Sequence, residues 1–446
     1  MTSINIKKET AMPGITRQNS LLVNQDWTKI YESFRNADFQ SYDFQTLRKA
    51  MIDYIKIYYP ENFNDYIESS EYIALIDLIA FLGQSLAFRT DLNARENFID
   101  TAERRDSVLK LAKLISYNPK RNQTATGFIK FDNVQTTERL KDSNGIDLTN
   151  SIIKWNDPTN LNWYEQFITV LNACLPRNQQ IGKPANSKTI AGVLNAEYNV
   201  NLPSNAIPVV PYSTLVDGSA LQFEAVSGTS VDREYIYEAS PGPGVPLNII
   251  YKNDNLGNAS NNTGFFFYFK QGVLQNQEFI FNESIPNNLA SINFDNINNT
   301  DVWLYQINNF GLIVDEWSKI PSVVGTNIIY NNNAAKKSFQ VNSRTGDQID
   351  LVFGDGTFAE IPVGSFRTYF RSSIGLSYTI TPDEMSNISL NIPYISKSGR
   401  LETLTVVASL KYTVANAIAR ESLAEIKTKA PQLFYSQNRM INGEDY

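Results

Sequence analysis

The chain changes from a helical to a strand-like pattern within one stretch, LKLAKLISYNPKRNQTATGFIKF, which spans residues 109–131. Before Asn118-Pro119 the apolar residues recur every three or four positions, whereas in Gly127–Phe131 they alternate. The first spacing is typical of amphipathic helices and the second of half-buried strands. The stretch therefore predicts an α+β fold with an N-terminal helical region, β-rich middle domains and a C-terminal α/β segment.

Four helices are predicted on the N-terminal side of this change. The first two cover residues 27–34 and 44–58, and the second ends before Pro60 because a residue that precedes proline avoids helical geometry. The third, over residues 73–87, is apolar across a wide arc that another surface has to cover. The fourth opens at residues 100–103, where Asp and Glu resemble a capping box, and carries Val108, Leu109, Ala112 and Ile115.

Strands are predicted to dominate the following two hundred residues or so. The run GFFFYF at Gly264–Phe269 predicts a strand that is buried on both faces. Ile349–Phe353 alternates into Gly354-Asp355-Gly356, with Phe358 and Ile361 beyond, which predicts a β-hairpin. No period dominates between residues 136 and 188, a stretch that we treat as an inserted subdomain.

The chain is predicted to become helical again near its end. Pro431 is expected to stop this helix, and Glu425 and Lys429 to form an i,i+4 pair. One helical face would carry Tyr412, Ala415, Ile418, Ala419, Ser422, Leu423 and Ile426. We therefore expect three regions: a helical region over 1–120, a β-rich region of one or two subdomains over 121–335, and a hairpin-plus-helix region over 336–446.

Composition excludes most catalytic chemistry. The 446 residues include no His and a single Cys, Cys174, which removes Ser-His-Asp triads, Cys-His pairs, intrachain disulfides and the usual zinc sites. The richest acidic cluster, Asp347, Asp350 and Asp355, does not have the spacing of a calcium-binding loop and is read as strand-end and turn aspartates. We expect no catalytic residues, no metal and no cofactor.

Charge and hydropathy restrict the partners. With 39 Lys and Arg against 46 Asp and Glu, the net charge is −7, so nucleic acid is not an expected ligand. The most apolar stretch, Ile73–Gly83, is interrupted by Asp77 and shorter than the ~20 residues that cross a bilayer, which predicts no membrane insertion. The N-terminus has no apolar secretory core, so folding in a cytoplasm is expected.

Two segments resemble a known family. Residues 77–131, with the pattern NARENFIDTAERRDSVLKLA, resemble the N-terminal region of baseplate wedge proteins of T-even-type contractile-tailed bacteriophages, the gene product six family, and more distantly baseplate J-like proteins. Residues 342–375 resemble the FGDG-x-x-A-x-IP-x-G hairpin of the same family. Ala430-Pro431, Gln437-Asn438-Arg439 and Glu444-Asp445-Tyr446 match its AP...QNR...EDY motif. Residues 136–251 match no segment of the family.

The resemblance implies a structural subunit of the virion and no enzyme. Its copies would form wedges that assemble into a ring around the central hub and link the hub to the sheath. Partners would be a second copy, other wedge subunits, and hub and sheath-proximal proteins. Family members continue past the EDY motif into a region associated with wedge dimerisation, whereas this sequence stops at the motif, so the resemblance does not carry that contact over to it.

We predict that the N-terminal helices pack with a second copy and another wedge subunit, since their apolar surface exceeds what one chain can hide. The predicted interface residues are Trp27, Ile30, Phe34, Met51, Ile55, Ile73, Ile76, Ile79, Tyr412, Ile418 and Ile426. An intrachain core is an equal alternative for the three isoleucines at 73, 76 and 79.

Two other functions stay open at this stage. The Asn-rich β region suggests a tail-fibre or receptor-binding protein, which glycan binding and a trimeric state would favour. A glycoside hydrolase that uses only carboxylates would need activity on bacterial polysaccharide. The long helical N-terminus argues against both.

Overall fold

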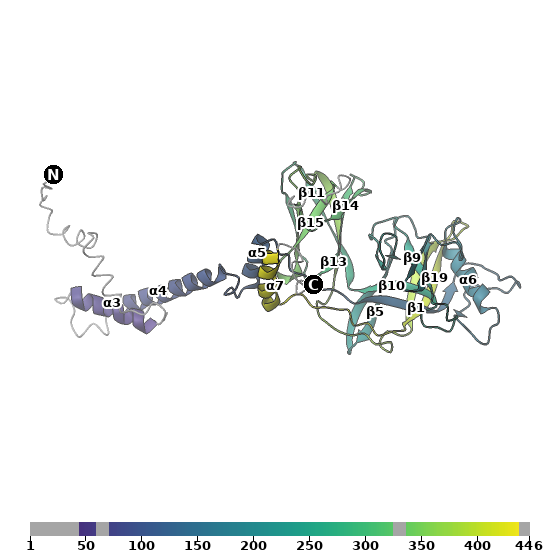
Figure 1. Cartoon of the computed structure of the whole chain (residues 1–446), viewed down its shortest axis with the longest axis horizontal. Coiled ribbons are helices and arrows are strands. Elements are labelled where there is room, and N and C mark those ends of the chain that lie inside the picture. The colour runs from purple at the N-terminus through teal and green to yellow at the C-terminus, as the bar shows by residue number, and fades with distance from the viewer. Residues whose placement is uncertain (1–43, 59–70, 324–335, 437–446) are drawn as a thin grey trace. The chain divides into compact units, whose positions relative to one another are not determined.

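The computed structural model of the chain describes residues 44–58, 71–323 and 336–436 (Figure 1). Helices make up 20% and strands 38%, which confirms the predicted α+β class. Internal contacts divide the chain into two units, Met1–Leu111 and Ala112–Tyr446. The helical region falls in the first unit and the sheets in the second.

The described helices of the N-terminal unit are α3 (Phe44–Tyr58), α4 (Glu71–Glu96) and α5 (Arg105–Leu114), the last of which ends in the second unit. The bounds of α3 confirm the predicted second helix. The predicted third helix is also confirmed, although α4 extends well past its expected end at residue 87. The helix predicted over residues 27–34 lies outside the described residues.

The C-terminal unit contains a ten-stranded sheet, which we call the first sheet. Its strands are β1 (Thr126–Thr136), β2 (Ile153–Lys154), β3 (Asn186–Ile190), β4 (Val193–Val200), β5 (Val209–Val216), β6 (Ser219–Val226), β9 (Leu247–Asn253), β10 (Gly264–Gln271), β18 (Ile388–Ile395) and β19 (Leu401–Leu410). The main order is β18-β19-β1-β10-β9-β4-β3, with antiparallel pairing throughout. The hairpin of β5 and β6 joins it through β10, and β2 pairs with β1.

Strand β10 lies at the centre of the first sheet and is buried along its whole length, which confirms the prediction from the aromatic run. One of its faces places Phe265 and Phe267 in the main core, where Phe267 packs 4.7 Å from Phe131 of β1. Helix α6 (Trp163–Cys174) lies beside this sheet (Figure 1), and its Phe167 stacks on Phe265 at 5.8 Å. Residues 136–188, for which the sequence pattern predicted no secondary structure, therefore supply part of this core through α6.

A seven-stranded sheet, the second sheet, follows in the chain. Its strands are β11 (Val273–Phe281), β12 (Leu289–Ile292), β13 (Ile297–Ile307), β14 (Ile313–Lys319), β15 (Ser338–Ser343), β16 (Ile349–Phe353) and β17 (Gly364–Ser372). The order is β11-β17-β13-β14-β15-β16-β12, and only β14 and β15 pair in parallel. A separate ribbon joins β7 (Gly228–Thr229) to β8 (Tyr237–Glu238), and a 3-10 turn covers Thr345–Asp347.

The predicted hairpin after Phe353 is wrong. Strand β16 pairs with β15 and β12, and not with the segment that follows it. The two glycines form a turn instead, in which Gly356 N–H donates to the carbonyl of Ala359 at 2.9 Å. A Cβ at Gly354 would lie 2.5 Å from the Ala359 oxygen, so this close approach requires glycine.

The predicted C-terminal helix is correct in kind but wrong in extent. Helix α7 runs from Leu423 to Ser436, with Pro431 inside it. Ser422 and Glu425 cap its start reciprocally, because Glu425 N–H donates to Ser422 Oγ and Ser422 N–H to Glu425 Oε2. Tyr412 and Ile418 lie before the helix, in a segment whose backbone bonds to Ile380 and Gln123. Lys429 pairs with Glu425 at 4.0 Å, as predicted.

Strands from both sides of the expected boundary at residues 335/336 occur in each sheet. In the first sheet β19 pairs with β1, and in the second β17 pairs with β13. Both sheets therefore belong to one compact unit, Ala112–Tyr446.

Candidate interface on helix α4 and a buried ion cluster

Helices α3 and α4 pack against each other within the N-terminal unit. Arg48 Nε of α3 donates to Asp77 Oδ1 of α4 at 2.6 Å, and a Cβ at Gly83 would lie 3.5 Å from Leu47 Cδ1. Both contacts come from adjacent residues of α3 and lie along one side of α4. Ile73, Ile76 and Ala80 lie on the same side of α4 as these contacts and are buried.

The rest of α4 exposes large apolar side chains on two flanks. Leu75, Leu78, Ile79, Leu82 and Leu86 follow the spacing of one helical stripe, and each is between 49% and 68% exposed. Phe81 and Phe88, two turns apart on another flank, are 60% and 57% exposed. A helix that is covered on one side and apolar on two others needs further partners, because such a large apolar patch is rare on a monomer.

Helix α4 is also long and apolar enough to cross a membrane by length and composition. An 18-residue window within residues 73–96 has a mean hydropathy of 1.5, and 17% of that window is buried. Length therefore does not exclude membrane insertion, contrary to the prediction from Ile73–Gly83, because the helix extends well past that apolar stretch. Asp77 in its ion pair with Arg48, and the pair of Arg95 with Asp91 at 3.0 Å, place charges along this helix.

The capping box predicted at Asp100 and Glu103 is wrong. Helix α5 begins at Arg105, and the carboxylate near its start belongs to Glu96 at the end of α4. Glu96 Oε1 accepts the backbone N–H groups of Glu103 and Arg104 at 3.0 and 3.1 Å. A hydrogen bond from Ser107, followed by these N–H groups, lowers the pKa of the Glu96 carboxyl.

Three of the residues predicted for the interface from the N-terminal helices, at positions 27, 30 and 34, lie outside the described residues. Met51 and Ile55 are half-buried on α3. Ile73 and Ile76 are buried within the unit, with 8% and 7% of their surface exposed, whereas Ile79 is exposed. Burial within the unit leaves little of Ile73 and Ile76 for a partner.

The three C-terminal residues predicted for the interface also divide into exposed and buried ones. Tyr412 and Ile418 are exposed, whereas Ile426 is fully buried on α7. The predicted set omitted most of the exposed residues of α4, which are Leu75, Leu78, Phe81, Leu82, Leu86 and Phe88. The wide apolar arc of this helix indicated that some of its apolar side chains need a partner, but the sequence alone did not show which side α3 covers.

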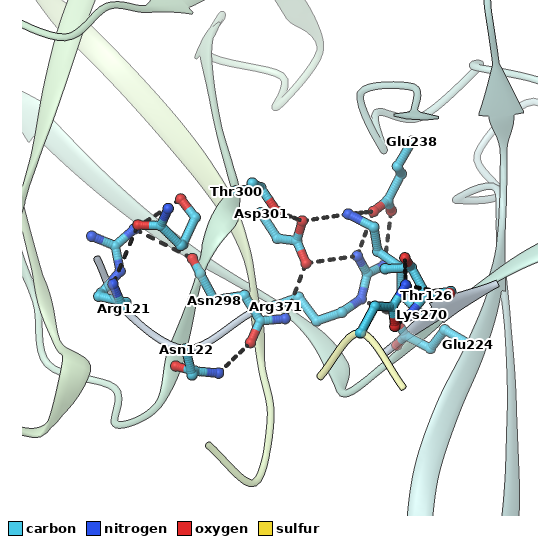
Figure 2. A network of polar contacts seen from close by, with 12 residues as sticks. Arg121, Asn122, Thr126, Glu224, Glu238, Lys270, Asn298, Thr300, Asp301 and Arg371 are labelled. Carbon is cyan, nitrogen blue, oxygen red and sulfur yellow. Dashed lines mark hydrogen bonds and ion pairs between the residues drawn. The ribbon is translucent and has the colours of Figure 1, made fainter. Parts of the chain in front are cut away.

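A cluster of buried charges joins the first and second sheets (Figure 2). At its centre the Arg371 guanidinium of β17 donates to Glu238 of β8 at 2.5 and 2.8 Å and to Glu224 of β6 at 2.8 Å. The Lys270 ammonium of β10 lies 2.5 Å from Asp301 of β13 and 3.2 Å from Glu238. We call these five residues the ion cluster.

Each charge in the ion cluster depends on its neighbours. Burial alone would raise the pKa of Asp301, but the Lys270 ammonium and the Arg371 guanidinium hold it well below its ordinary value. Burial alone would lower the pKa of Lys270, but Asp301 and Glu238 raise it. The Asp301 carboxylate is therefore held ionised by the two cations beside it, whereas burial raises the pKa of the Glu224 carboxyl.

Two residues that precede β1 extend the network toward the second sheet (Figure 2). Asn122 Nδ2 donates to Asn298 Oδ1 at 2.9 Å, and Asn298 Nδ2 donates to Asp301 Oδ2 at 3.0 Å. Arg121 donates to the backbone carbonyls of Ile297 and Asn298 at 3.2 and 3.3 Å. Burial lowers the pKa of Arg121 to about 10. The chain entering the first sheet is thus bonded to the second.

The acidic residues near position 350 each have a separate partner. Asp347 is buried and lies 3.7 Å from Arg420, Asp350 accepts a bond from Ser291 Oγ at 2.7 Å, and Asp355 accepts one from Thr357 N–H in the turn. Within the described ranges no group of three or more His, Cys, Asp and Glu side chains could hold a metal ion.

Comparison with known families agrees with the character of the helical region. Residues 43–114, which span α3, α4 and α5, match the family described as "Bacteriophage baseplate protein, N-terminal domain". The match supports a phage baseplate protein with a structural role and a place in the phage tail. Residues 127–413 match the family described as "Domain of unknown function (DUF8360)", so the chain belongs to that family. No curated protein matches the chain.

Proposed function

We propose that the chain is a wedge subunit of a contractile-tail baseplate. In this proposal residues 1–120 form the region that packs with a second copy and another wedge subunit, and the wedges assemble into a ring around the central hub. The sheets of the remaining chain form the rigid body that links the hub to sheath-proximal proteins. The subunit carries out no reaction.

The exposed apolar flanks of α4 are the observation that carries the proposal. The sequence match to baseplate N-terminal domains covers this helix. One flank would suffice for a simple dimer, but Leu82 and Phe81 lie on different flanks, and each is more than half exposed. Two flanks beside the side that α3 covers suit a bundle with more than one additional helix.

The ion cluster supports the rigid-body part of the proposal. Removing one member of a buried charge network leaves the others unpaired, so such networks favour one arrangement of the strands that carry them. Arg371 joins β17 of the second sheet to β6 of the first sheet and to the β7–β8 ribbon. A fixed arrangement of sheets suits a body that links other proteins of an assembly.

Site-specific photocrosslinking tests the proposal in infected cells. A photoreactive amino acid at Leu82 is expected to form crosslinks to a second copy and to a different tail protein, because Leu82 is 57% exposed on the proposed interface. The same probe at Leu256, an 80% exposed residue of a loop in the other unit, is the control. Crosslinks from Leu82 to lipid would indicate a membrane-bound helix, and the absence of protein crosslinks would refute the bundle.

A further inference from the structure

Strand β11 is the longest edge strand of either sheet. The strand orders end at β18 and β3 in the first sheet and at β11 and β12 in the second, and the β5–β6 hairpin adds an edge at β5. Of these, β11 is the longest, with nine residues and nine consecutive pairs to β17 without a bulge. Lysine, proline and bulges commonly prevent another strand from pairing with an edge, and the sequence VLQNQEFIF has none of them. Its one charged residue is Glu278.

The outer backbone groups of β11 can be assigned from two hydrogen bonds. Gly272 N–H donates to the Gln222 carbonyl and Leu274 N–H to Glu224 Oε1, both at the side away from β17. Because backbone groups alternate sides along an antiparallel strand, those of Asn276, Glu278 and Ile280 point outward as well. In the part of the chain that the structure describes, these three N–H groups have no hydrogen-bond partner.

At the edge strand β18, two outward positions are blocked from pairing with a further strand. There the outward N–H of Ile395 donates to the Asn201 carbonyl at 2.7 Å. Two positions earlier on the same side, Pro393 has no N–H to offer. Edges β3 and β12 have only five and four residues. The β5 edge has eight residues and contains Pro211. The edge of β11 is therefore longer than each of these and contains no proline.

We infer that the outer edge of β11 binds an extended segment of another protein chain, which adds to the second sheet as a further strand. Main-chain hydrogen bonds to Asn276, Glu278 and Ile280 would hold the segment, as in other cases of strand addition. This inference does not depend on the proposed wedge function.

The side chains of β11 indicate what the added segment carries. Phe279 and Phe281 pack at the rim of the second-sheet core and are only partly buried, so apolar residues at alternate positions of the segment would cover them. On the opposite face Glu278 keeps 54% of its side chain exposed beside Arg367, which favours a basic residue across from it. Next to it Ile280 borders a surface cavity of about 460 Å³.

A second copy of the chain is a poorer occupant for this edge. The seven residues from Gln275 to Phe281 span roughly 23 Å, and a sheet about 10 Å thick then offers a footprint of roughly 230 Å². A stable dimer buries about 800 Å² on each partner. A two-fold pairing centred on Glu278 would also place two carboxylates side by side.

The test uses the full-length chain and a synthetic peptide with the β17 sequence GSFRTYFRS. In the chain this sequence pairs with β11, with Phe366 opposite Phe279 and Arg367 opposite Glu278. We expect the labelled peptide to bind in a fluorescence-anisotropy titration at up to millimolar concentration, and to slow hydrogen exchange of the amides at 276, 278 and 280.

Asn276→Pro removes one outward N–H without touching the pairing with β17, and should weaken peptide binding roughly tenfold. Ser389→Pro makes the same change on the outward side of β18 and should leave binding unchanged. Ile280→Pro repeats the test if the first variant melts at a lower temperature than the wild type.

Three results would overturn the inference. The first is no peptide binding at millimolar concentration. The second is binding that both proline variants of β11 leave unchanged, since a peptide that displaces β17 does not use the outer edge. The third is a dimer of the free chain that Asn276→Pro abolishes, which would assign this edge to a second copy.

Discussion

Replacing Leu82 by Asp tests whether the exposed flank of α4 is a protein interface. Leu82 is 57% exposed in the chain. Fully burying a leucine side chain yields about 1.5–3 kcal/mol, so covering the exposed part of Leu82 contributes roughly 1 kcal/mol. A carboxylate left unpaired in the interface adds a penalty of several kcal/mol. We therefore expect the substitution to weaken association by more than about 3 kcal/mol, which is over a hundredfold in the association constant.

Sedimentation velocity of the full-length chain, alone and mixed with the other tail proteins of its phage, measures this effect. The wild type should form a larger species at concentrations at which Leu82→Asp stays monomeric. Circular dichroism should show the same helix content in both, because Leu82 lies on the side of α4 away from Ile76 and Ala80.

Two matched substitutions make the result specific. Leu256→Asp places the same change at an 80% exposed leucine of a loop and should leave association intact. Ile76→Asp, at a residue only 7% exposed, should instead unfold the α3–α4 pair and reduce helix content. If Leu82→Asp assembles like the wild type, the reasoning about α4 is refuted.

Three further predictions concern the sheets. Arg371→Met leaves Glu224 and Glu238 without their strongest partner, so urea unfolding should show a loss of about 3–5 kcal/mol, and a loss below about 1 kcal/mol would contradict the account. Since the folded-state pKa of Asp301 lies below its ordinary 3.8, its stabilising effect is present above that value and is lost as the pH falls through the folded-state pKa. Melting temperatures between about pH 5 and pH 2 should therefore fall less steeply in Asp301→Asn than in the wild type, and equal slopes would remove Asp301 from the ion cluster. Gly272 has φ +119°, and a Cβ there would lie 2.4 Å from the Ser372 oxygen, whereas Gly145, at φ +82°, has no such neighbour within 4 Å. Gly272→Ala should cost about 2–4 kcal/mol and Gly145→Ala about 1 kcal/mol, and equal losses would show that the close approach at Gly272 is not rigid.

The local sequence pattern was enough to predict those helices and strands for which it allows few alternatives. The buried strand at Gly264–Phe269 and the helix at Phe44–Tyr58 were predicted because an aromatic run and a proline boundary leave few alternatives. The strand at Gly127–Phe131 was predicted from its alternation alone.

Predictions failed where a distant partner decides the structure. The segment after Phe353 has the turn residues of a hairpin, but the partners of β16 are β15 and the distant β12. Residues 412–418 have helical spacing, but backbone bonds to Gln123 and Ile380 hold them extended. A periodic pattern does not contain the competing long-range pairing.

The candidate site was only partly accessible to sequence reasoning for the same reason. The apolar arc of the third helix indicated that a partner surface exists, but the packing of α3 determined that Ile73 is covered and Leu82 is not. The ion cluster gave no sequence signal, because Glu224, Asp301 and Arg371 are far apart in the chain and come together only through sheet topology.

An electron-microscopy map of the intact phage particle tests the central claim most directly. We predict that α4 lies in the baseplate within a bundle of helices from other protein chains, with Leu75, Leu82 and Phe88 packed against them. A map in which α4 faces solvent or lipid, or in which the chain lies outside the baseplate, would contradict the claim.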